Sequence, residues 1–253
     1  MPSKINLLCK ECGKEFKKLK KEYNRQIKNG REENEFFCSR GCSTSYSNKQ
    51  RYQKRDTKGK KEACKIKWSN NFAYFVGLIV SDGNIAKNRP RISFTNKDKE
   101  LINYVKQIVE AIINKEYEPI KCEKDGCVYW IYQFTSRKLY YFMKNIGIKP
   151  NKSKTIEKVN IPDKYFNDFL RGIIDGDGSF YKRGGNYTVT IVSGSKRFLK
   201  WLRNKISNKL NLKGYIRFNR NVYSLRYFKD SQEIANYIYN GGMCLTRKRN
   251  IIK

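Results

Sequence analysis

The chain has 253 residues, with 55 lysines and arginines against 23 acids and a formal net charge of +32 at pH 7. This charge favours a polyanionic partner over a small neutral substrate, because each phosphate contact by lysine or arginine releases condensed counterions. Histidine is absent, which excludes Ser-His-Asp and Cys-His nucleophilic sites and leaves chemistry to carboxylates, lysines, hydroxyls or metal ions.

Neither a membrane span nor a secretory signal is evident, since no apolar stretch is long enough for either. We therefore expect an intracellular protein: in the cytoplasm or nucleoid of a bacterial or phage-infected cell, or in an organelle. In such a reducing compartment, cysteines serve as thiols or metal ligands more readily than as disulfides.

Residues 1–46 contain two close cysteine pairs, Cys9 with Cys12 and Cys38 with Cys42. Four thiolates in two short turns suit one tetrahedral structural Zn²⁺ ion. The alternative is two pairs of free or core thiols, but a segment with so few aliphatic residues would then struggle to fold alone. The other cysteines are interpreted as structural: Cys64, Cys122, Cys127 and Cys244.

Residues 47–69 are rich in lysine and arginine and nearly free of aliphatic residues. This composition is typical of a solvated linker or of an arm that binds a nucleic-acid backbone. Whether the cysteine module before it contacts DNA or another protein is left open.

The remaining sequence is duplicated. FVGLIVSDG at 75–83 is repeated as LRGIIDGDG at 170–178, and NKSKT at 151–155 resembles TRKRN at 246–250. The spacing of roughly 95 residues indicates duplication of a whole domain and not a short solenoid repeat. We expect two similar halves, residues 70–155 and 156–253, that imitate a symmetric dimer.

Each half is predicted to run helix, hairpin, helix, hairpin, helix. In the first half the apolar patterns predict helices over 72–80, 101–112 and 137–146 and strands over 91–95 and 128–135. In the second half they predict strands over 187–191 and 216–219, a helix over 198–206, and a last helix that begins near Asp230 and Glu233 and stops by Gly241.

The predicted strands have one apolar face and one polar face. Such polar sheets suit the DNA major groove, which admits a β-ribbon; the alternative is a merely solvent-exposed face. The residues expected to contact DNA are Arg89, Arg91, Ser93, Thr95, Lys182, Arg183, Thr188, Thr190, Arg217, Asn219 and Arg226.

Small residues recur four apart in both motifs, at Gly77 and Ser81 and at Gly172 and Gly176. Residues four apart share one helix face, and small ones let two helices approach closely. Parallel packing of the two helices would bring Asp82 and Asp177, at their ends, side by side. Two adjacent carboxylates repel unless cations intervene, so a divalent metal is expected between them. The alternative is that each Asp-Gly pair only ends a helix.

These motifs resemble the two LAGLIDADG motifs of monomeric homing endonucleases, and the resemblance covers about residues 70–253. It implies an α+β fold of two pseudo-symmetric αββαββα halves with saddle-shaped antiparallel sheets. It also implies that Asp82 and Asp177 hold two or three Mg²⁺ ions, with the backbone carbonyls of Ser81 and Gly176 as further ligands. Asp175 faces Val80 in the motif alignment, so that earlier acid is not a symmetric requirement.

The resemblance extends to side chains around the scissile phosphates. Asn96 takes the place of a glutamine before the second helix, whereas the same place in the second half reads Ser193-Gly194-Ser195, and Gly194 has no side chain to serve. Lys152 and Lys248 resemble lysines that face the active site, where they would stabilise phosphoryl charge; the alternative is a phosphate-binding or solvated lysine.

The function implied is that of a monomer that cuts double-stranded DNA at one long, asymmetric site, with two unequal cuts and short 3′ overhangs. A non-cutting transcription regulator or an intron RNA maturase is the alternative, and intron RNA stays open as a further partner. Both acids are retained, which favours cleavage, and the narrow major groove of RNA suits β-ribbons poorly. Free-standing and intron-encoded origins both stay open.

Overall fold

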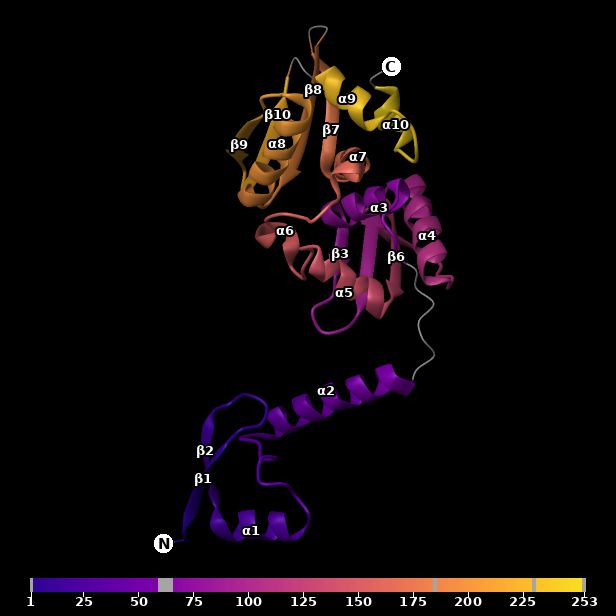
Figure 1. Ribbon diagram of the computed structural model, residues 1–253. Coiled ribbons are helices and arrows are strands. Elements are labelled where there is room, and N and C mark those ends of the chain that lie inside the picture. The colour runs from indigo at the N-terminus through magenta and orange to yellow at the C-terminus, as the bar shows by residue number, and fades with distance from the viewer. Residues whose placement is uncertain (1, 59–65, 184–185, 229–230, 252–253) are drawn as a thin grey trace. The chain divides into compact units, whose positions relative to one another are not determined.

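The computed structural model describes residues 2–58, 66–183, 186–228 and 231–251, with the side chains of 51–58, 182, 183 and 186 excepted. The chain divides into two compact units, Met1–Lys61 and Glu62–Lys253 (Figure 1). Within the described residues, no helix combines the length and the apolar character that a membrane crossing requires.

The first unit is small. Strand β1 (Lys4–Leu8) pairs antiparallel with β2 (Glu15–Leu19), and α1 (Lys20–Lys28) and α2 (Arg40–Lys58) follow. Among its described side chains, the buried hydrophobic ones are Cys9 and Phe36. The segment from residue 47, predicted as a linker or arm, is helical as far as Lys58, which its lysines, arginines and glutamines favour. Cys64 lies outside the described residues.

The second unit contains the duplicated halves. The first comprises α3 (Asn70–Ser81), β3 (Gly83–Ile85), β4 (Arg91–Asn96), α4 (Lys99–Ile113), β5 (Ile120–Lys124), β6 (Cys127–Thr135), α5 (Arg137–Asn145) and the short α6 (Lys152–Thr155). The second comprises a 3-10 turn (Asp163–Tyr165), α7 (Phe166–Asp177), β7 (Gly178–Arg183), β8 (Asn186–Ser193), α8 (Lys196–Leu210), β9 (Tyr215–Asn219), β10 (Val222–Tyr227), α9 (Ser231–Ile238) and α10 (Thr246–Asn250).

Both halves form the same antiparallel sheet. The strand orders are β3-β4-β6-β5 and β7-β8-β10-β9, so the central and edge strands correspond. The predicted α+β fold of two αββαββα halves is therefore confirmed. Ser136 caps the helix predicted over 137–146, since its hydroxyl accepts a hydrogen bond from Leu139 N at the start of α5. Asp230 lies outside the described residues, and α9 ends at Ile238, before the predicted stop at Gly241.

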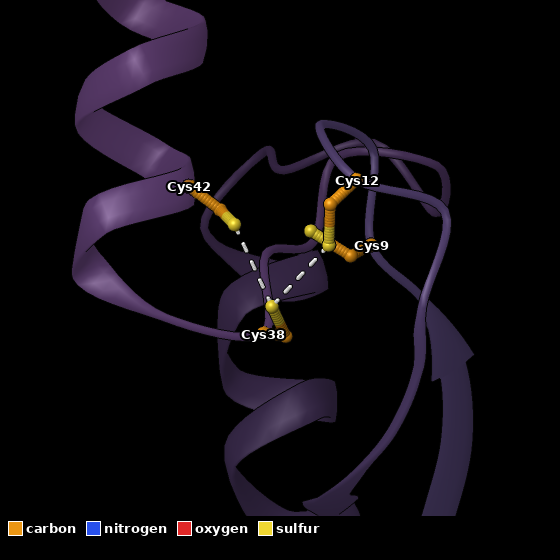
Figure 2. A group of neighbouring side chains, drawn as sticks. All are labelled: Cys9, Cys12, Cys38 and Cys42. Carbon is orange, nitrogen blue, oxygen red and sulfur yellow. Dashed lines mark hydrogen bonds between the residues drawn. The ribbon is translucent and has the colours of Figure 1, made fainter. Parts of the chain in front are cut away.

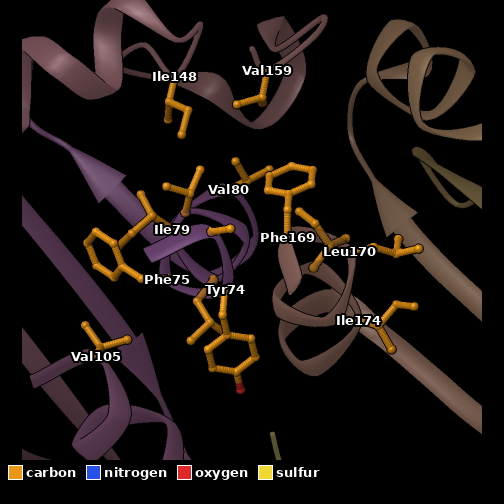
Figure 3. Packing of buried hydrophobic residues seen from close by; sticks show 14 of the residues in the cluster. Tyr74, Phe75, Ile79, Val80, Val105, Ile148, Val159, Phe169, Leu170 and Ile174 are labelled. Atoms are coloured by element: carbon orange, nitrogen blue, oxygen red, sulfur yellow. The ribbon is translucent and has the colours of Figure 1, made fainter. Parts of the chain in front are cut away.

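The two halves meet where α3 packs against α7. An ideal Cβ on Gly77 would lie 2.3 Å from Phe169 O and 2.9 Å from Gly172 Cα, and one on Gly172 would lie 2.2 Å from Tyr74 O. The helix backbones are therefore in direct contact, as the spacing of small residues predicts. Figure 3 shows Phe75 and Ile79 of α3 directed toward the first half, and Leu170 and Ile174 of α7 directed toward the second. Each helix thus contributes apolar side chains to the core of its own half.

Gly77→Ala is expected to lower the free energy of unfolding of this unit by about 1–3 kcal/mol. The added methyl group would meet a carbonyl oxygen and a Cα atom, which cannot move aside as a flexible side chain can. Urea denaturation measures the change. Lys200→Ala, on the exposed face of α8, is the control and should stay within about 0.5 kcal/mol of wild type. A Gly77→Ala protein as stable as this control would contradict the backbone contact.

A buried arginine fixes the C-terminal segment to α7. The Arg171 side chain is fully buried, donates to Met243 O at 2.8 Å and to Ile238 O at 2.7 Å, and pairs with Asp168 at 2.5 Å. Asn70 Nδ2 donates to the other oxygen of Asp168 at 2.9 Å. This buried ion pair and its hydrogen bonds join α3, α7 and the chain between α9 and α10, and so hold α10 close to the end of α7.

Candidate functional site

The two repeated motifs, FVGLIVSDG and LRGIIDGDG, end in acids at the helix–sheet junctions. Asp82 caps the C-terminus of α3, Asp177 is the last residue of α7, and each is followed by a glycine that opens a strand. A Cβ on Gly83 would lie 2.6 Å from Ile79 Cα, and one on Gly178 would lie 2.6 Å from Ile174 Cα. The chain must therefore have glycine after each acid, where it turns from the helix into the sheet.

The acids lie close together because the helix ends do. A Cβ on Gly176 would lie 2.0 Å from Ser81 Oγ and 3.1 Å from Asp82 Oδ2. Loss of hydration, followed by the negative charge of Asp82, raises the pKa of Asp177 to about 6, although its side chain reaches solvent. Loss of hydration also raises the pKa of Asp82, against the opposing effects of Asn96, Lys248 and Lys152. The charged acids thus lack full compensation within the protein.

Two lysines contact the same helix ends. Lys152 Nζ donates to Ser81 O at 3.2 Å, and Lys248 Nζ donates to Ile174 O at 2.6 Å, Asp175 O at 2.8 Å, Gly176 O at 3.2 Å and Gly178 O at 2.6 Å. These side chains are 6% and 4% exposed, so neither is a solvated lysine. Burial lowers the pKa of each lysine to about 8, although nearby acids raise it. Both satisfy carbonyls at the negative end of a helix.

The atoms at this site that could bind a metal ion are oxygens. They are the carboxylates of Asp82 and Asp177 and the carbonyls of Ser81 and Gly176, and each of these carbonyls accepts one hydrogen bond from a lysine. A carbonyl oxygen has two lone pairs, so one remains for another partner. Gly176 also leaves open the space next to Asp82 that a side chain would fill. An oxygen donor set with uncompensated charge fits a hard divalent cation such as Mg²⁺.

Asn96 is in direct contact with the first acid. Its Nδ2 donates to Asp82 Oδ2 at 2.8 Å, and its Oδ1 accepts from Asp98 N at 2.8 Å. The amide side chain is therefore held from both ends, as suits a residue that positions the carboxylate.

Ser193, and not Gly194, is the counterpart of Asn96. The motif glycines pair with Phe94 in one sheet and with Ile191 in the other, which places Asn96 and Ser193 two residues further along. Ser193 Oγ accepts from Ser195 N at 3.1 Å, just as Asn96 accepts from Asp98 N. The equivalence expected from the sequence alone, Asn96 with Gly194, is therefore wrong by one residue.

The shorter serine leaves a small cavity beside the second acid. Among the described residues, no hydrogen bond joins Ser193 to Asp177, and both line a cavity of about 70 Å³ together with Lys152. Polar groups form part of the lining, and the space is large enough to hold water. Gly194 cannot supply the missing group, because a Cβ there would lie 2.6 Å from Ser153 O. The surroundings of the two acids therefore differ, as the sequence predicts, but the residue responsible for the difference is Ser193 and not Gly194.

Asp175, the additional acid of the second motif, is buried in a hydrogen-bond network. It accepts from Tyr74 OH at 2.8 Å, Tyr239 OH at 2.7 Å and Leu245 N at 2.8 Å. These donors come from α3, the end of α9 and the start of α10. Asp175 thus joins the halves and has a structural position, which explains why the first motif does without it.

The predicted DNA-contact residues share one face of the sheets, but they differ in exposure. Arg91, Ser93 and Thr95 alternate with the buried Ile92 and Phe94. In the second half Arg217 and Asn219 are exposed and Arg226 is half-buried, whereas Thr188 and Thr190 are almost covered. The strand register explains why these two threonines are buried, since Tyr181 lies across from Thr188 and Arg226 across from Thr190. Arg89 is exposed in the β3–β4 connection, and the side chains of Lys182 and Arg183 lie outside the description.

Figure 2 shows the four cysteines of the first unit directed toward one another. All four Sγ atoms lie within 4.8 Å, with Cys12 to Cys38 at 3.7 Å and Cys38 to Cys42 at 3.6 Å. Four sulfurs around tetrahedral zinc would be about 3.8 Å apart. Burial alone would raise the pKa of the Cys9 thiol. Hydrogen bonds from backbone N–H groups, of which that of Cys38 has the largest effect, outweigh burial and lower the pKa to about 6. The predicted four-cysteine cluster is thus present, with a geometry that fits zinc.

The remaining described cysteines are free thiols outside that cluster. Cys244 is buried, which fits the predicted structural role. Cys127 is exposed and Cys122 is partly exposed on the β5–β6 hairpin, so neither belongs to a core.

The fold and the acid pair define a duplicated α+β protein in which two antiparallel sheets flank two closely packed helices with acidic ends. The chain belongs to the LAGLIDADG-like domain family, whose model matches residues 69–147 and 166–239.

Two curated relatives come from Methanocaldococcus jannaschii. The uncharacterized protein MJ0398 is 23% identical over 197 residues, which are 72% of this chain and 69% of that protein. DNA-directed RNA polymerase subunit Rpo1C is 27% identical over 144 residues, which are 56% of this chain but 16% of that subunit. The chain therefore spans only a small part of the polymerase subunit that it matches.

Three solved structures share the fold. The homing endonuclease I-WcaI bound to its DNA recognition sequence has a TM-score of 0.56 at 16% identity, covering 74% of this chain and 88% of that one. I-DmoI in complex with DNA and Mn has a TM-score of 0.51 at 19% identity, covering 68% and 98%. Full-length DUF199/WhiA from Thermatoga maritima has a TM-score of 0.52 at 18% identity, covering 75% and 62%.

Proposed function

We propose that this protein is a Mg²⁺-dependent homing endonuclease that hydrolyses both strands of DNA at one long, asymmetric site and leaves short 3′ overhangs. The observation that carries the proposal is the acid pair: Asp82 and Asp177 meet at the ends of two helices in backbone contact, and each has a raised pKa. The net charge of +32 supplies the attraction for DNA. Similarity in fold to structures described as endonucleases bound to DNA, one with Mn, supports it.

The residues of the site have distinct tasks in this mechanism. Asp82 and Asp177, with the carbonyls of Ser81 and Gly176, would hold the divalent ions. Bound Mg²⁺ supplies Lewis-acid stabilisation of the phosphate and activation of water. Asn96 fixes the orientation of the Asp82 carboxylate through its 2.8 Å hydrogen bond. The Nζ atoms of Lys152 and Lys248 place positive charge beside the acids, where it would stabilise the negative charge that develops during hydrolysis.

The test begins with selection of a target site from a random library of double-stranded DNA, followed by addition of Mg²⁺ and sequencing of the product ends. We expect double-strand breaks at one site, with 3′ overhangs, and none in EDTA. A protein that binds its selected site tightly but does not cut it with any divalent metal would instead be a non-cutting binder, either a regulator or a maturase. Binding of intron RNA is measured in parallel with the same protein.

The two strands are expected to be cut at unequal rates. Asn96 contacts Asp82, whereas Ser193 does not reach Asp177. Ser193→Asn should speed the slower cut by about tenfold, the size of one hydrogen bond to a charged group. The measurement is the fraction of nicked plasmid during a single turnover. Asn96→Ser should slow cleavage of the other strand. An unchanged nicked fraction in both variants would contradict these roles.

The cysteine cluster is proposed to hold one structural Zn²⁺ ion, and the first unit, with its helix α2, is proposed to extend the DNA contact. We further propose that the protein acts as a monomer, because its two halves already supply both acids, and that it works inside the cell, where its DNA lies.

A further inference from the structure

The polar faces of the two sheets can be compared position by position. In the first sheet, Ser93 of β4 pairs with Gln133 of β6. In the second, Thr190 of β8 pairs with Arg226 of β10. Both pairs lie one residue from the strand residue that faces the motif glycine. Gln133 and Arg226 therefore occupy equivalent places, at the same number of residues from the acids.

The next equivalent position, nearer the acids, also differs. In the first sheet it consists of Thr95 with Ile131 and Ile120, two apolar residues on the polar face. In the second sheet it consists of Val192 with Ser224 and Arg217. Ile120 is 59% exposed and Arg217 is exposed as well, so both can meet a ligand on this face.

The second sheet also has unmet hydrogen-bonding capacity. Thr190 Oγ1, Ser224 Oγ and Arg226 Nε are buried without a hydrogen-bond partner among the described residues. Thr190 and Ser224 are each only 7% exposed. Buried polar atoms nearly always have partners in the functional state of a protein. The other two such atoms in the described part, Tyr132 OH in the first half and Tyr227 OH in the second, lie on the core faces of their sheets. The remaining unpaired polar groups therefore lie on the polar face of the second sheet, beside Arg226 and Arg217, and the described residues of the first sheet have none on that face.

The major-groove code assigns a base to each of these side chains. Arginine pairs with guanine through O6 and N7, glutamine pairs with adenine through N6 and N7, and apolar side chains meet the thymine methyl group. We propose that the second sheet reads G·C pairs through Arg226 and Arg217, and that the first sheet reads A·T pairs through Gln133 and the Ile120–Ile131 pair. The inference rests on the proposed DNA recognition and specifies the target at these two equivalent positions: G·C pairs in one half-site stand where A·T pairs stand in the other.

Site selection with Ca²⁺ in place of Mg²⁺ tests this composition without relying on cleavage. The full-length protein selects from a random duplex library, and the wild-type consensus is compared with those of Arg226→Gln and Gln133→Arg. Arg226→Gln should change one guanine of the consensus to adenine and weaken binding to the wild-type site by roughly ten- to hundredfold. Gln133→Arg should make the opposite change in the other half-site. Lys200→Gln, which removes one charge from the exposed side of α8, is the control and should leave the consensus unchanged.

Three outcomes would overturn the inference. In the first, the consensus of Arg226→Gln keeps its guanine; in the second, the variant weakens binding to all sequences equally, as loss of a phosphate contact does. Either result, obtained with a clear wild-type consensus, removes base reading by Arg226 but leaves the proposed nuclease intact. Failure of the wild-type protein to select any sequence would refute specific DNA recognition itself, and the assignment of bases with it.

Discussion

Asp82→Asn and Asp177→Asn are each expected to reduce DNA cleavage by about a thousandfold or more while DNA affinity stays equal or increases. Each substitution removes a carboxylate that would hold divalent metal and keeps nearly the same shape. Each also removes a negative charge from a place where phosphates must come close, so binding should not weaken. Single-turnover cleavage on the selected site with saturating Mg²⁺, together with binding in Ca²⁺, separates the two effects.

Two other aspartates serve as controls for these variants. Asp163→Asn removes an exposed acid that pairs with Lys205 and should cleave like wild type. Asp175→Asn alters a buried acceptor of three hydrogen bonds, so its main effect should be on stability. If both motif variants still cut at the wild-type rate, the acid pair is not the catalytic centre.

Removal of zinc is expected to unfold the first unit and to leave the second unit folded. The described side chains of the first unit include only two buried hydrophobic residues, so its core is too small to replace the metal. Structural zinc in comparably small peptides contributes about 10–16 kcal/mol. Cys9→Ser should therefore lose about one zinc per chain and make residues within Met1–Lys61 sensitive to protease.

Elemental analysis and limited proteolysis of the purified protein measure both effects. Cys127→Ser, at an exposed thiol outside the cluster, is the matched control and should keep its zinc. Protein purified without chelator that contains no zinc, with the first unit still protease-resistant, would show that the four thiols are not a zinc site.

The central helices and both acids are predictable from sequence because their chemistry is local. Gly77 and Gly172 mark a helix face with no side chain, and the glycine after each acid is required by the turn into the sheet. The four cysteines are likewise found by spacing, since each pair lies within a few residues. The duplication strengthens the prediction of the motif helices and their acids, because a feature that recurs at the equivalent place in the second half does not arise from composition alone.

The pairing of Asn96 with Ser193 shows where sequence comparison fails. From the motif glycine to the strand residue that it faces, the first hairpin is two residues longer in the second half (Gly178 to Ile191) than in the first (Gly83 to Phe94), so the spacing of equivalent residues changes along the chain. Alignment on the helix caps would have paired Asn96 with Ser193 correctly. Asp98 and Ser195 start equivalent helices, and each lies two residues after the side chain that accepts its N–H hydrogen bond.

Contacts between distant segments could not be predicted either. Lys248 reaches four carbonyls around the end of α7 only because the buried Arg171 holds the C-terminal segment in place. The cover over Thr190 depends on strand register, which brings Arg226 beside it. Such positions follow from tertiary packing, for which single-sequence patterns contain no signal.

Anomalous scattering from Mn²⁺ in a crystal of the protein with its selected DNA tests the acid pair most directly. Manganese peaks in contact with the carboxylates of both Asp82 and Asp177 and with phosphate oxygens of both strands are the predicted result. A DNA complex whose manganese lies elsewhere, or in which the two carboxylates touch no metal, would contradict the proposed nuclease.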